Sequence, residues 1–199
     1  MAETTVEPAP EAVPSPAPAA ATPAPSAPLS MEERIRRNRV LGLAIAAAIF
    51  VLDQAVKWSM TYLMQLKQRQ SAEILPFFRL TWEENRGVSM GFLTAGSETE
   101  RWLLVAMTAA ISLFVLAWLW REKRRDDAIA LAFVLGGALG NIFDRVRLGY
   151  VVDFADLHFG SIHPFLIFNV GDAAITIGVL LLLVRALLTR DRKAPEEDK

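Results

Sequence analysis

Four long apolar segments, separated by stretches rich in charged residues, constrain the fold of this 199-residue chain more than any other feature. The clearest segment covers residues 102–120, in which only Thr108 and Ser112 are polar. At 1.5 Å per residue a helix of this length spans roughly 28 Å, close to the ~30 Å hydrocarbon core of a bilayer. Tryptophans lie near both of its ends, as is typical at membrane interfaces. We therefore predict that this segment crosses a membrane.

The other three segments predict further membrane helices, over about residues 40–62, 128–145 and 167–188. The composition agrees, because 53% hydrophobic residues and 22% charged residues are compatible only if the two kinds are segregated along the chain. The fold class predicted is a membrane all-α protein with four transmembrane helices. A soluble protein with four buried helices is the alternative.

The distribution of basic residues predicts the topology. Thirteen of the 21 Lys and Arg residues lie before the first segment, between the second and third, and at the end of the chain. These three stretches share one side of a four-helix membrane protein, and the positive-inside rule makes that side cytoplasmic. Both termini are therefore expected in the cytoplasm, with residues 58–101 and 145–165 outside.

The regions around the helices have their own character. Residues 1–30 hold eight of the eleven prolines and are expected to be a disordered tail, ahead of a membrane domain over 31–190 and a cytoplasmic tail over 191–199. The outer region over about 72–95 predicts a small β-sheet, with a strand at 74–82, a turn at 84–87 and a returning strand at 88–93.

Composition also excludes several kinds of site. The chain has no cysteine, which rules out disulfides and thiolate nucleophiles, and its two histidines argue against a His-rich metal site. The net charge of −1 gives no support for nucleic-acid binding.

Polar residues gather where the helices are expected to meet the outer boundary of the membrane. Ionisable groups at such depths are candidates for function, because burying them is costly unless they are paired or hydrated. They come from four separate parts of the chain: Asp53 and Lys57; Asn141, Asp144 and Arg145; Asp153 and Asp156; Asn169 and Asp172. The alternative is structural, with Asp53–Lys57 and Asp144–Arg145 as ion pairs that register the helices and Gly136-x-x-x-Gly140 as a packing motif.

Asp153 and Asp172 differ from the other acids, because neither has an opposite charge close in sequence. Each could pair distantly with Arg145 or Lys57, or the two could face each other. Two carboxylates that share a site retain one proton near neutral pH and can supply a general base and a general acid for peptide hydrolysis. A proton-coupled exporter and a non-enzymatic assembly protein remain as other classes, although an exporter usually places its key carboxylate at mid-membrane.

Five motifs carry a resemblance to a known family. They are D-Q-A-V-K at 53–57, N-R-G-V-S at 85–89, G-G-A-L-G-N-I-F-D-R at 136–145, G-Y-V-V-D-F at 149–154 and F-N-V-G-D-A at 168–173. In this order they resemble the motifs of bacterial lipoprotein signal peptidase (signal peptidase II), over about residues 40–188. The chain departs from the family in having Met90 where Phe is common and Gly171 where Ala is common.

The resemblance implies an aspartyl endopeptidase of four transmembrane helices with a small outer β-sheet. Such an enzyme removes signal peptides from diacylglyceryl-modified prolipoproteins by cutting N-terminal to the lipidated cysteine. It implies Asp153 and Asp172 as the catalytic residues. The supporting residues expected are Asp53, Lys57, Asn85, Asn141, Asp144, Arg145 and Asn169.

The resemblance also predicts the setting of the enzyme. No cofactor or metal is expected, and the expected partners are the lipidated prolipoprotein substrate and membrane lipid, with no nucleic acid. We expect a monomer in the bacterial plasma (inner) membrane, with its active site at the outer (periplasmic) boundary.

Overall fold

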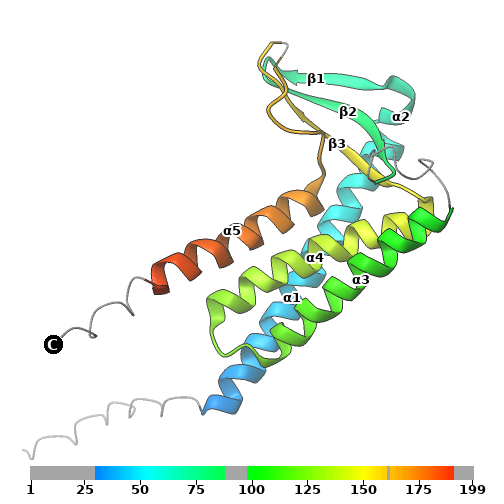
Figure 1. The fold of residues 1–199 in the computed structure, drawn as a ribbon. Coiled ribbons are helices and arrows are strands. Elements are labelled where there is room, and N and C mark those ends of the chain that lie inside the picture. Colours follow the sequence, from blue (N-terminus) through cyan, green and yellow to red (C-terminus); the bar gives the residue numbers. More distant parts are fainter. Residues whose placement is uncertain (1–29, 88–97, 161, 191–199) are drawn as a thin grey trace, which may run out of the picture.

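The fold is a bundle of four long helices with a small sheet at one end (Figure 1). The computed structural model describes residues 30–87, 98–160 and 162–190. The long helices are α1 (Met31–Trp58), α3 (Glu98–Arg121), α4 (Arg125–Leu148) and α5 (Val170–Arg190). Each is long and apolar enough to cross a membrane, which confirms the four predicted spans. The predicted tails, apart from Ser30, and the returning strand at 88–93 lie outside the described residues.

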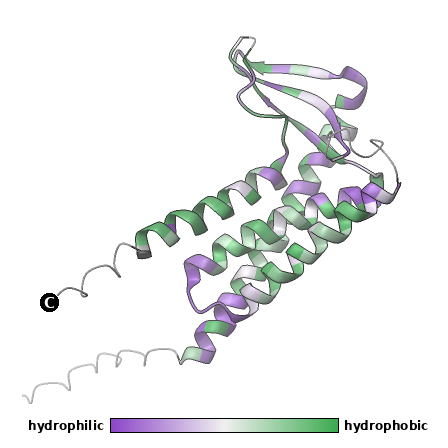
Figure 2. Ribbon diagram, in the orientation of Figure 1, coloured by the Kyte–Doolittle hydropathy of each residue, from purple (hydrophilic) through white to green (hydrophobic). Residues whose placement is uncertain are grey.

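Helix α4 lies at the centre of the bundle and packs against α1, α3 and α5. The buried core between α1, α3 and α4 includes Ala46, Leu119, Leu131 and Leu135. Most other large apolar side chains of the helices point outward, and Figure 2 shows the helices as largely hydrophobic along their length. Such an outward-facing apolar surface suits contact with lipid chains rather than with water.

Helix α1 begins well before the predicted start at residue 40, at Met31. Ser30 Oγ accepts a hydrogen bond from the Glu33 amide (3.2 Å), and the Glu33 carboxylate accepts one from the Ser30 amide (2.8 Å). This capping box satisfies two backbone donors at the helix start. The basic stretch before the apolar segment is therefore part of the same helix.

The outer region is more elaborate than the sequence predicts. After α1 come a π-helical turn (Ser59–Leu63), the short helix α2 (Leu66–Arg69), and strands β1 (Ser71–Leu75) and β2 (Phe78–Asn85). The single strand predicted over 74–82 is wrong, because a two-residue turn at Pro76 and Phe77 divides it into two strands. The turn predicted at 84–87 is also misplaced, since Glu84 and Asn85 still belong to β2.

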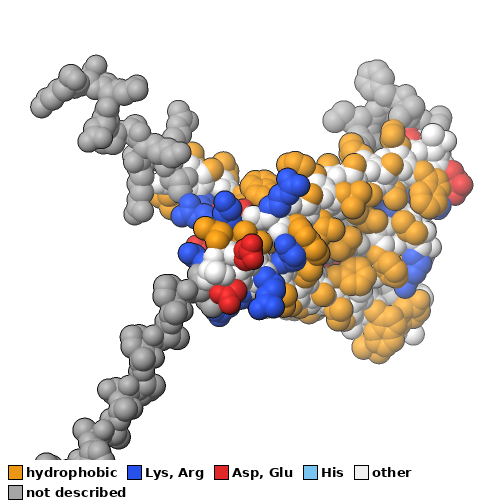
Figure 3. Space-filling model, turned by 90° about the horizontal axis from the view of Figure 1, so that it is seen from below, with side chains coloured by type: hydrophobic (Ala, Val, Ile, Leu, Met, Phe, Trp, Pro, Cys, Tyr) orange, Lys and Arg blue, Asp and Glu red, His pale blue; other side chains and the backbone are white. Residues whose placement is uncertain are grey.

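A third strand, β3 (Val151–Leu157), was not predicted and completes an antiparallel sheet of order β1-β2-β3. The sheet packs on the helices through Leu80, Trp82, Val152 and Phe154, together with Leu66 of α2. It lies at the end of the bundle where α1 and α4 finish and α5 begins (Figure 1). The opposite end carries the start of α1 and the α3–α4 connection, and Figure 3 shows Lys and Arg side chains gathered there beside an apolar flank.

Candidate active site

Asp153 is held in the middle of β3 with its side chain almost completely buried. One carboxylate oxygen accepts a hydrogen bond from Asn85 Nδ2 at 2.9 Å, and the other accepts from Asn169 Nδ2. Asn85 ends the neighbouring strand β2, where it lies diagonally across from Asp153 on the same face of the sheet. The sheet thus fixes the position of this carboxylate from two sides.

A β-bulge in β2 makes this contact possible. Leu80 pairs with Ala155 and Glu83 pairs with Asp153, so two residues of β2 stand opposite one residue of β3. Side chains alternate between the faces of a strand, and one extra residue therefore exchanges the faces of everything beyond it. Arg79 consequently lies with Asp156 on one face, whereas Asn85 lies with Asp153 on the other.

Asp172 lies in the first turn of α5 and is only half-buried. Its backbone amide donates to Asn169 Oδ1 (2.9 Å), and its carboxylate Oδ2 accepts from the Asn169 amide (3.2 Å). Asn169 is therefore the N-cap of α5, in a reciprocal arrangement that satisfies two backbone donors of the first turn. The cap explains why α5 begins at Val170 and not at the predicted residue 167.

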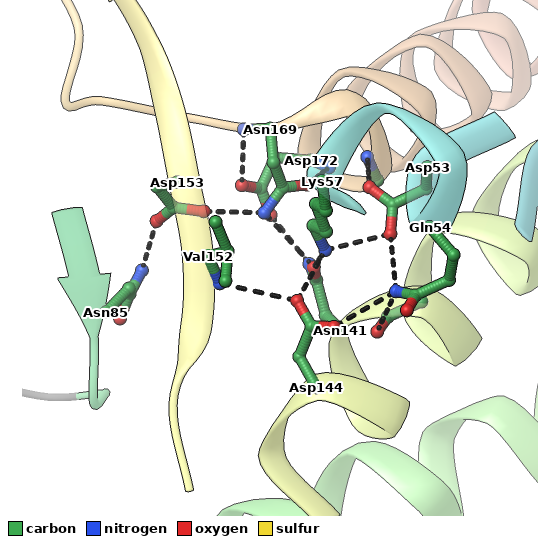
Figure 4. Close-up of polar contacts among 12 residues, drawn as sticks. Asp53, Gln54, Lys57, Asn85, Asn141, Asp144, Val152, Asp153, Asn169 and Asp172 are labelled. Carbon is green, nitrogen blue, oxygen red and sulfur yellow. Dashed lines mark hydrogen bonds and ion pairs between the residues drawn. The ribbon is translucent and has the colours of Figure 1, made fainter. Parts of the chain in front are cut away.

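Two asparagine amides connect the two carboxylates (Figure 4). Asn141 Nδ2 donates to Asp172 Oδ1 at 2.8 Å. Asn169 Nδ2 donates to Asp153 and, at 3.1 Å, to Asn141 Oδ1. Asp153 and Asp172, which lie on the consecutive elements β3 and α5, thus belong to one hydrogen-bond network at the sheet end of the bundle.

A buried ion cluster supports this network from the α1 side. Lys57 Nζ lies 2.8 Å from carboxylate oxygens of both Asp53 and Asp144, and it donates to Asn141 Oδ1 at 3.0 Å. The side chains of Lys57 and Asp53 are 4% and 0% exposed, a depth at which charges persist only when they are paired. The alternative that paired Asp144 with Arg145 is replaced by an ion pair between Asp144 and Lys57.

Three groups of this cluster were not predicted from the sequence. Gln54 Nε2 donates to Asp144 Oδ1 (3.0 Å), the Val152 amide donates to Asp144 Oδ2 (3.3 Å), and the Gly171 amide donates to Asp53 Oδ1 (2.8 Å). Only Gln54 left a signal in the sequence, as an amide beside Asp53 at the polar end of an apolar helix. The two backbone donors depend on how β3 and α5 approach α1 and α4.

Small residues allow that approach. A Cβ atom on Gly137 would collide with the carbonyl of Gly171, and one on Gly140 would collide with the Asp53 carboxylate. Gly136 in turn faces the α1 backbone at Ala46. The predicted packing role of Gly136-x-x-x-Gly140 is thus confirmed, and it extends to a second crossing between α4 and α5.

Arg145 interacts electrostatically with Asp172, Asp153 and Asp144. Among the described residues, no hydrogen-bond acceptor contacts its buried Nε. The guanidinium group is thus within electrostatic range of both carboxylates, and its Nε has hydrogen-bonding capacity to spare.

Burial raises the pKa of Asp153 to about 6. The hydrogen bond from Asn85 works in the opposite direction, and the negative charge of Asp172 adds to the increase. Asp153 can therefore hold a proton close to neutral pH, which an exposed aspartate cannot.

Asp156 lies on the other face of the sheet. Arg79 Nε (2.6 Å), Thr81 Oγ1 (3.3 Å) and His163 Nδ1 (3.0 Å) surround its carboxylate. Burial opposes ionisation of Asp156, but the hydrogen bonds from Arg79 and His163 outweigh it and lower the pKa. Asp156 is thus part of a structural ion cluster, separate from the network of Asp153 and Asp172.

Comparison with known proteins decides the family. A family model described as "Signal peptidase (SPase) II" matches residues 45–188, most of the chain. The chain belongs to the signal peptidase II family. It is therefore a membrane-embedded aspartic peptidase, and the exporter and the assembly protein are no longer needed as alternatives.

Individual signal peptidase II relatives agree. The lipoprotein signal peptidase of Rhizorhabdus wittichii is 58% identical over 161 residues, covering 81% of this chain and 94% of the relative. That of Sphingopyxis alaskensis is 52% identical, covering 79% of this chain and 91% of the relative. A solved bacterial membrane enzyme superposes with a TM-score of 0.66 at 29% identity, over 80% of this chain and 94% of that one.

Proposed function

We propose that Asp153 and Asp172 form the catalytic dyad of a peptidase that removes signal peptides from diacylglyceryl-modified prolipoproteins, N-terminal to the lipidated cysteine. The observation that carries the proposal is the amide network in which Asn169 contacts both carboxylates, one buried in β3 and one half-buried at the start of α5. The name shared by the relatives, lipoprotein signal peptidase, supports the substrate class.

The dyad holds one proton and one negative charge. The ionised carboxylate accepts a proton from a water molecule as its oxygen attacks the scissile carbonyl carbon, and the protonated carboxylate donates to the carbonyl oxygen. When the tetrahedral intermediate collapses, the C–N bond breaks, the leaving nitrogen takes up a proton from one carboxylate, and a hydroxyl of the intermediate returns its proton to the other. In this mechanism the proton is assigned to the pair and not to one carboxylate.

The surrounding residues position these groups. Asn141 and Asn169 orient the carboxylates through the hydrogen bonds described above, and Arg145 is placed to bind main-chain carbonyls of the substrate. The Lys57 cluster with Asp53 and Asp144 braces α1 against α4 and α5. Asn85 holds Asp153 from the sheet side.

The setting proposed is the bacterial plasma (inner) membrane, with the dyad at the outer (periplasmic) boundary and both chain termini in the cytoplasm. The basic residues at the end of the bundle opposite the sheet support this orientation. A site at this depth is reachable by a membrane-spanning signal segment from the bilayer and by water from outside. One chain supplies both carboxylates, in keeping with a monomer.

The test replaces each dyad residue with its neutral isostere. Asp153→Asn and Asp172→Asn should each insert into the membrane at normal levels and lower cleavage of a lipidated prolipoprotein by at least about a hundredfold, since general acid–base catalysis contributes about 10²–10⁴. Precursor and mature lipoprotein are separated by gel electrophoresis after reaction with the purified enzyme.

Asp156→Asn is the matched control, because Asp156 lies on the same strand, is equally buried, and faces away from the dyad. It should retain most of the cleavage rate. Normal processing by Asp153→Asn or Asp172→Asn would refute the dyad, and an equal loss in Asp156→Asn would show that any neutralised acid in β3 inactivates the enzyme.

A further inference from the structure

A cavity of about 460 Å³ lies on the outer half of α1 and α4, beneath the sheet. Neither Asp153 nor Asp172 lines it. Its lining comes mainly from α1, α4 and the sheet, with residues of the π-helical turn and α2, and includes Gln54, Lys57 and Asp144 of the ion cluster, here called its floor. The cavity therefore reaches the buried ion cluster without including the dyad.

The cavity opens toward the lipid-facing surface. Phe50 and Phe143 pack edge to face, with ring centroids 5.7 Å apart, and Phe143 is partly exposed at 41%. Trp58 and Tyr62 line the same cavity at the outer end of α1 and are 53% and 58% exposed. Aromatic residues of this kind lie at the level of lipid headgroups. The apolar walls are continuous with the membrane-facing surface of the bundle.

Two cations line the cavity near the sheet, Lys67 and Arg147. Lys67 contacts Glu84 at 2.9 Å, whereas Arg147 contacts no carboxylate within the described ranges and lies 5.6 Å from the Phe143 ring. The acid in the floor is already engaged, because Asp144 contacts Lys57 and accepts from Gln54. A ligand here therefore meets a free guanidinium and finds no free carboxylate.

We propose that this cavity binds one anionic phospholipid of the surrounding bilayer. Its phosphate would contact Arg147, and its acyl chains would follow Phe50 and Phe143 into the membrane. A guanidinium group suits phosphate because it can donate two parallel hydrogen bonds. Phosphatidylcholine fits less well, since it carries no net charge and gains less from the cations Lys67 and Arg147. This site is separate from the proposed dyad and does not depend on it.

The occupied site would strengthen the contact between α1 and α4 beside Lys57 and Asp144. A ligand that binds the folded protein raises its thermal midpoint in a saturable way. The test is a titration of the purified full chain in maltoside detergent with dioctanoyl phosphatidylglycerol, dioctanoyl phosphatidylcholine or inorganic phosphate. Unfolding is followed by light scattering, and lipid retention by native mass spectrometry.

Phosphatidylglycerol should raise the thermal midpoint saturably, with a clearly smaller effect of phosphatidylcholine and none of phosphate. Arg147→Gln should weaken the apparent affinity for phosphatidylglycerol about tenfold, as expected for loss of a charged hydrogen-bond donor. Trp58→Ala should weaken it by a smaller factor through the apolar wall. The matched control is Arg69→Gln, an exposed arginine of the same outer region that does not line the cavity; it should respond like the native chain.

Two outcomes would overturn the proposal. One is an equal response to inorganic phosphate, which would make this a site for soluble anions. The other is an unchanged affinity for phosphatidylglycerol in Arg147→Gln; a raised KM for the lipidated prolipoprotein in the same variant would then assign the cavity to substrate. Asp153→Asn should keep the full lipid response. Lipid binding is therefore tested independently of the proposed catalysis.

Discussion

Asn169 combines two tasks in one side chain. Its Oδ1 caps α5 by accepting from the Asp172 amide, and its Nδ2 donates to Asp153 and Asn141. A serine keeps the capping oxygen but lacks an amide donor. Substitution at this position can therefore separate helix stability from carboxylate alignment.

We expect Asn169→Ser to keep a thermal midpoint close to that of the native chain while lowering kcat about tenfold or more. Asn169→Ala should lose the cap as well, at a cost of about 1 kcal/mol in unfolding free energy. Thermal denaturation and prolipoprotein cleavage measured on the same preparations distinguish the two. Equal kcat values in the native chain and Asn169→Ser would show that the amide contact with Asp153 has no part in alignment.

Asn85 offers a test through pH. Its hydrogen bond stabilises the ionised form of Asp153, so removing it should raise the pKa of Asp153 further above its ordinary value. The dyad would then keep its shared proton to higher pH, and the alkaline limb of kcat/KM should move upward. A hydrogen bond to a charged group is worth about 1.5 kcal/mol, which corresponds to about one pH unit.

The measurement is the pH profile of kcat/KM for Asn85→Ala against the native enzyme. Thr81→Ala is the control, because Thr81 donates to Asp156 on the opposite face of the sheet and should leave the limb in place. A limb that stays fixed or moves to lower pH in Asn85→Ala would contradict the proposed coupling.

Among the elements, the crossing of α4 and α5 determines whether Asn141 and Asp172 can meet. The helices approach at Gly137 and Gly171, where the backbone of one lies against the backbone of the other. Alanine usually favours a helix over glycine by about 1 kcal/mol. A loss of stability on Gly137→Ala would therefore report the contact and not the helix propensity.

We expect Gly137→Ala to lower the unfolding free energy by about 1–3 kcal/mol through overpacking, and to lower cleavage by separating Asn141 from Asp172. Leu139→Ala, on the exposed side of the same helix, should affect cleavage little. Thermal denaturation in detergent and the cleavage assay provide both readouts. A Gly137→Ala enzyme more stable than the native chain would show that α4 and α5 have room at this crossing.

Across the molecule, the two ends of the bundle differ in charge and structure, and the orientation proposed above follows from this difference. Because the chain has no cysteine, single introduced cysteines report their side of the membrane without background. In spheroplasts, a membrane-impermeant maleimide should label Glu73→Cys in β1. It should label Lys123→Cys, between α3 and α4, only after permeabilisation. The reverse pattern would invert the topology and place the dyad on the cytoplasmic side.

The sequence was sufficient for properties that depend on the chain locally. The lengths of the apolar runs predicted four spans, and α1, α3, α4 and α5 confirm them, because a bilayer of fixed thickness selects helices by length and composition. Spacings of three and four residues placed Asp53 with Lys57 and Asn169 with Asp172, and both pairs are in contact. Helix starts were less accurate, since capping by Ser30 and Asn169 sets them and not the apolar runs.

Contacts between distant elements required the tertiary structure. Lys57, and not Arg145, pairs with Asp144, and the bulge in β2 brings Asn85 rather than Arg79 to the face of Asp153. β3 was missed because a strand buried on both faces shows no clear alternation of polar and apolar residues. One physical reason accounts for these three contacts and elements. Apolar length and charge can be recognised in the local sequence, whereas the partner of a buried polar group depends on the register at which separate elements pack.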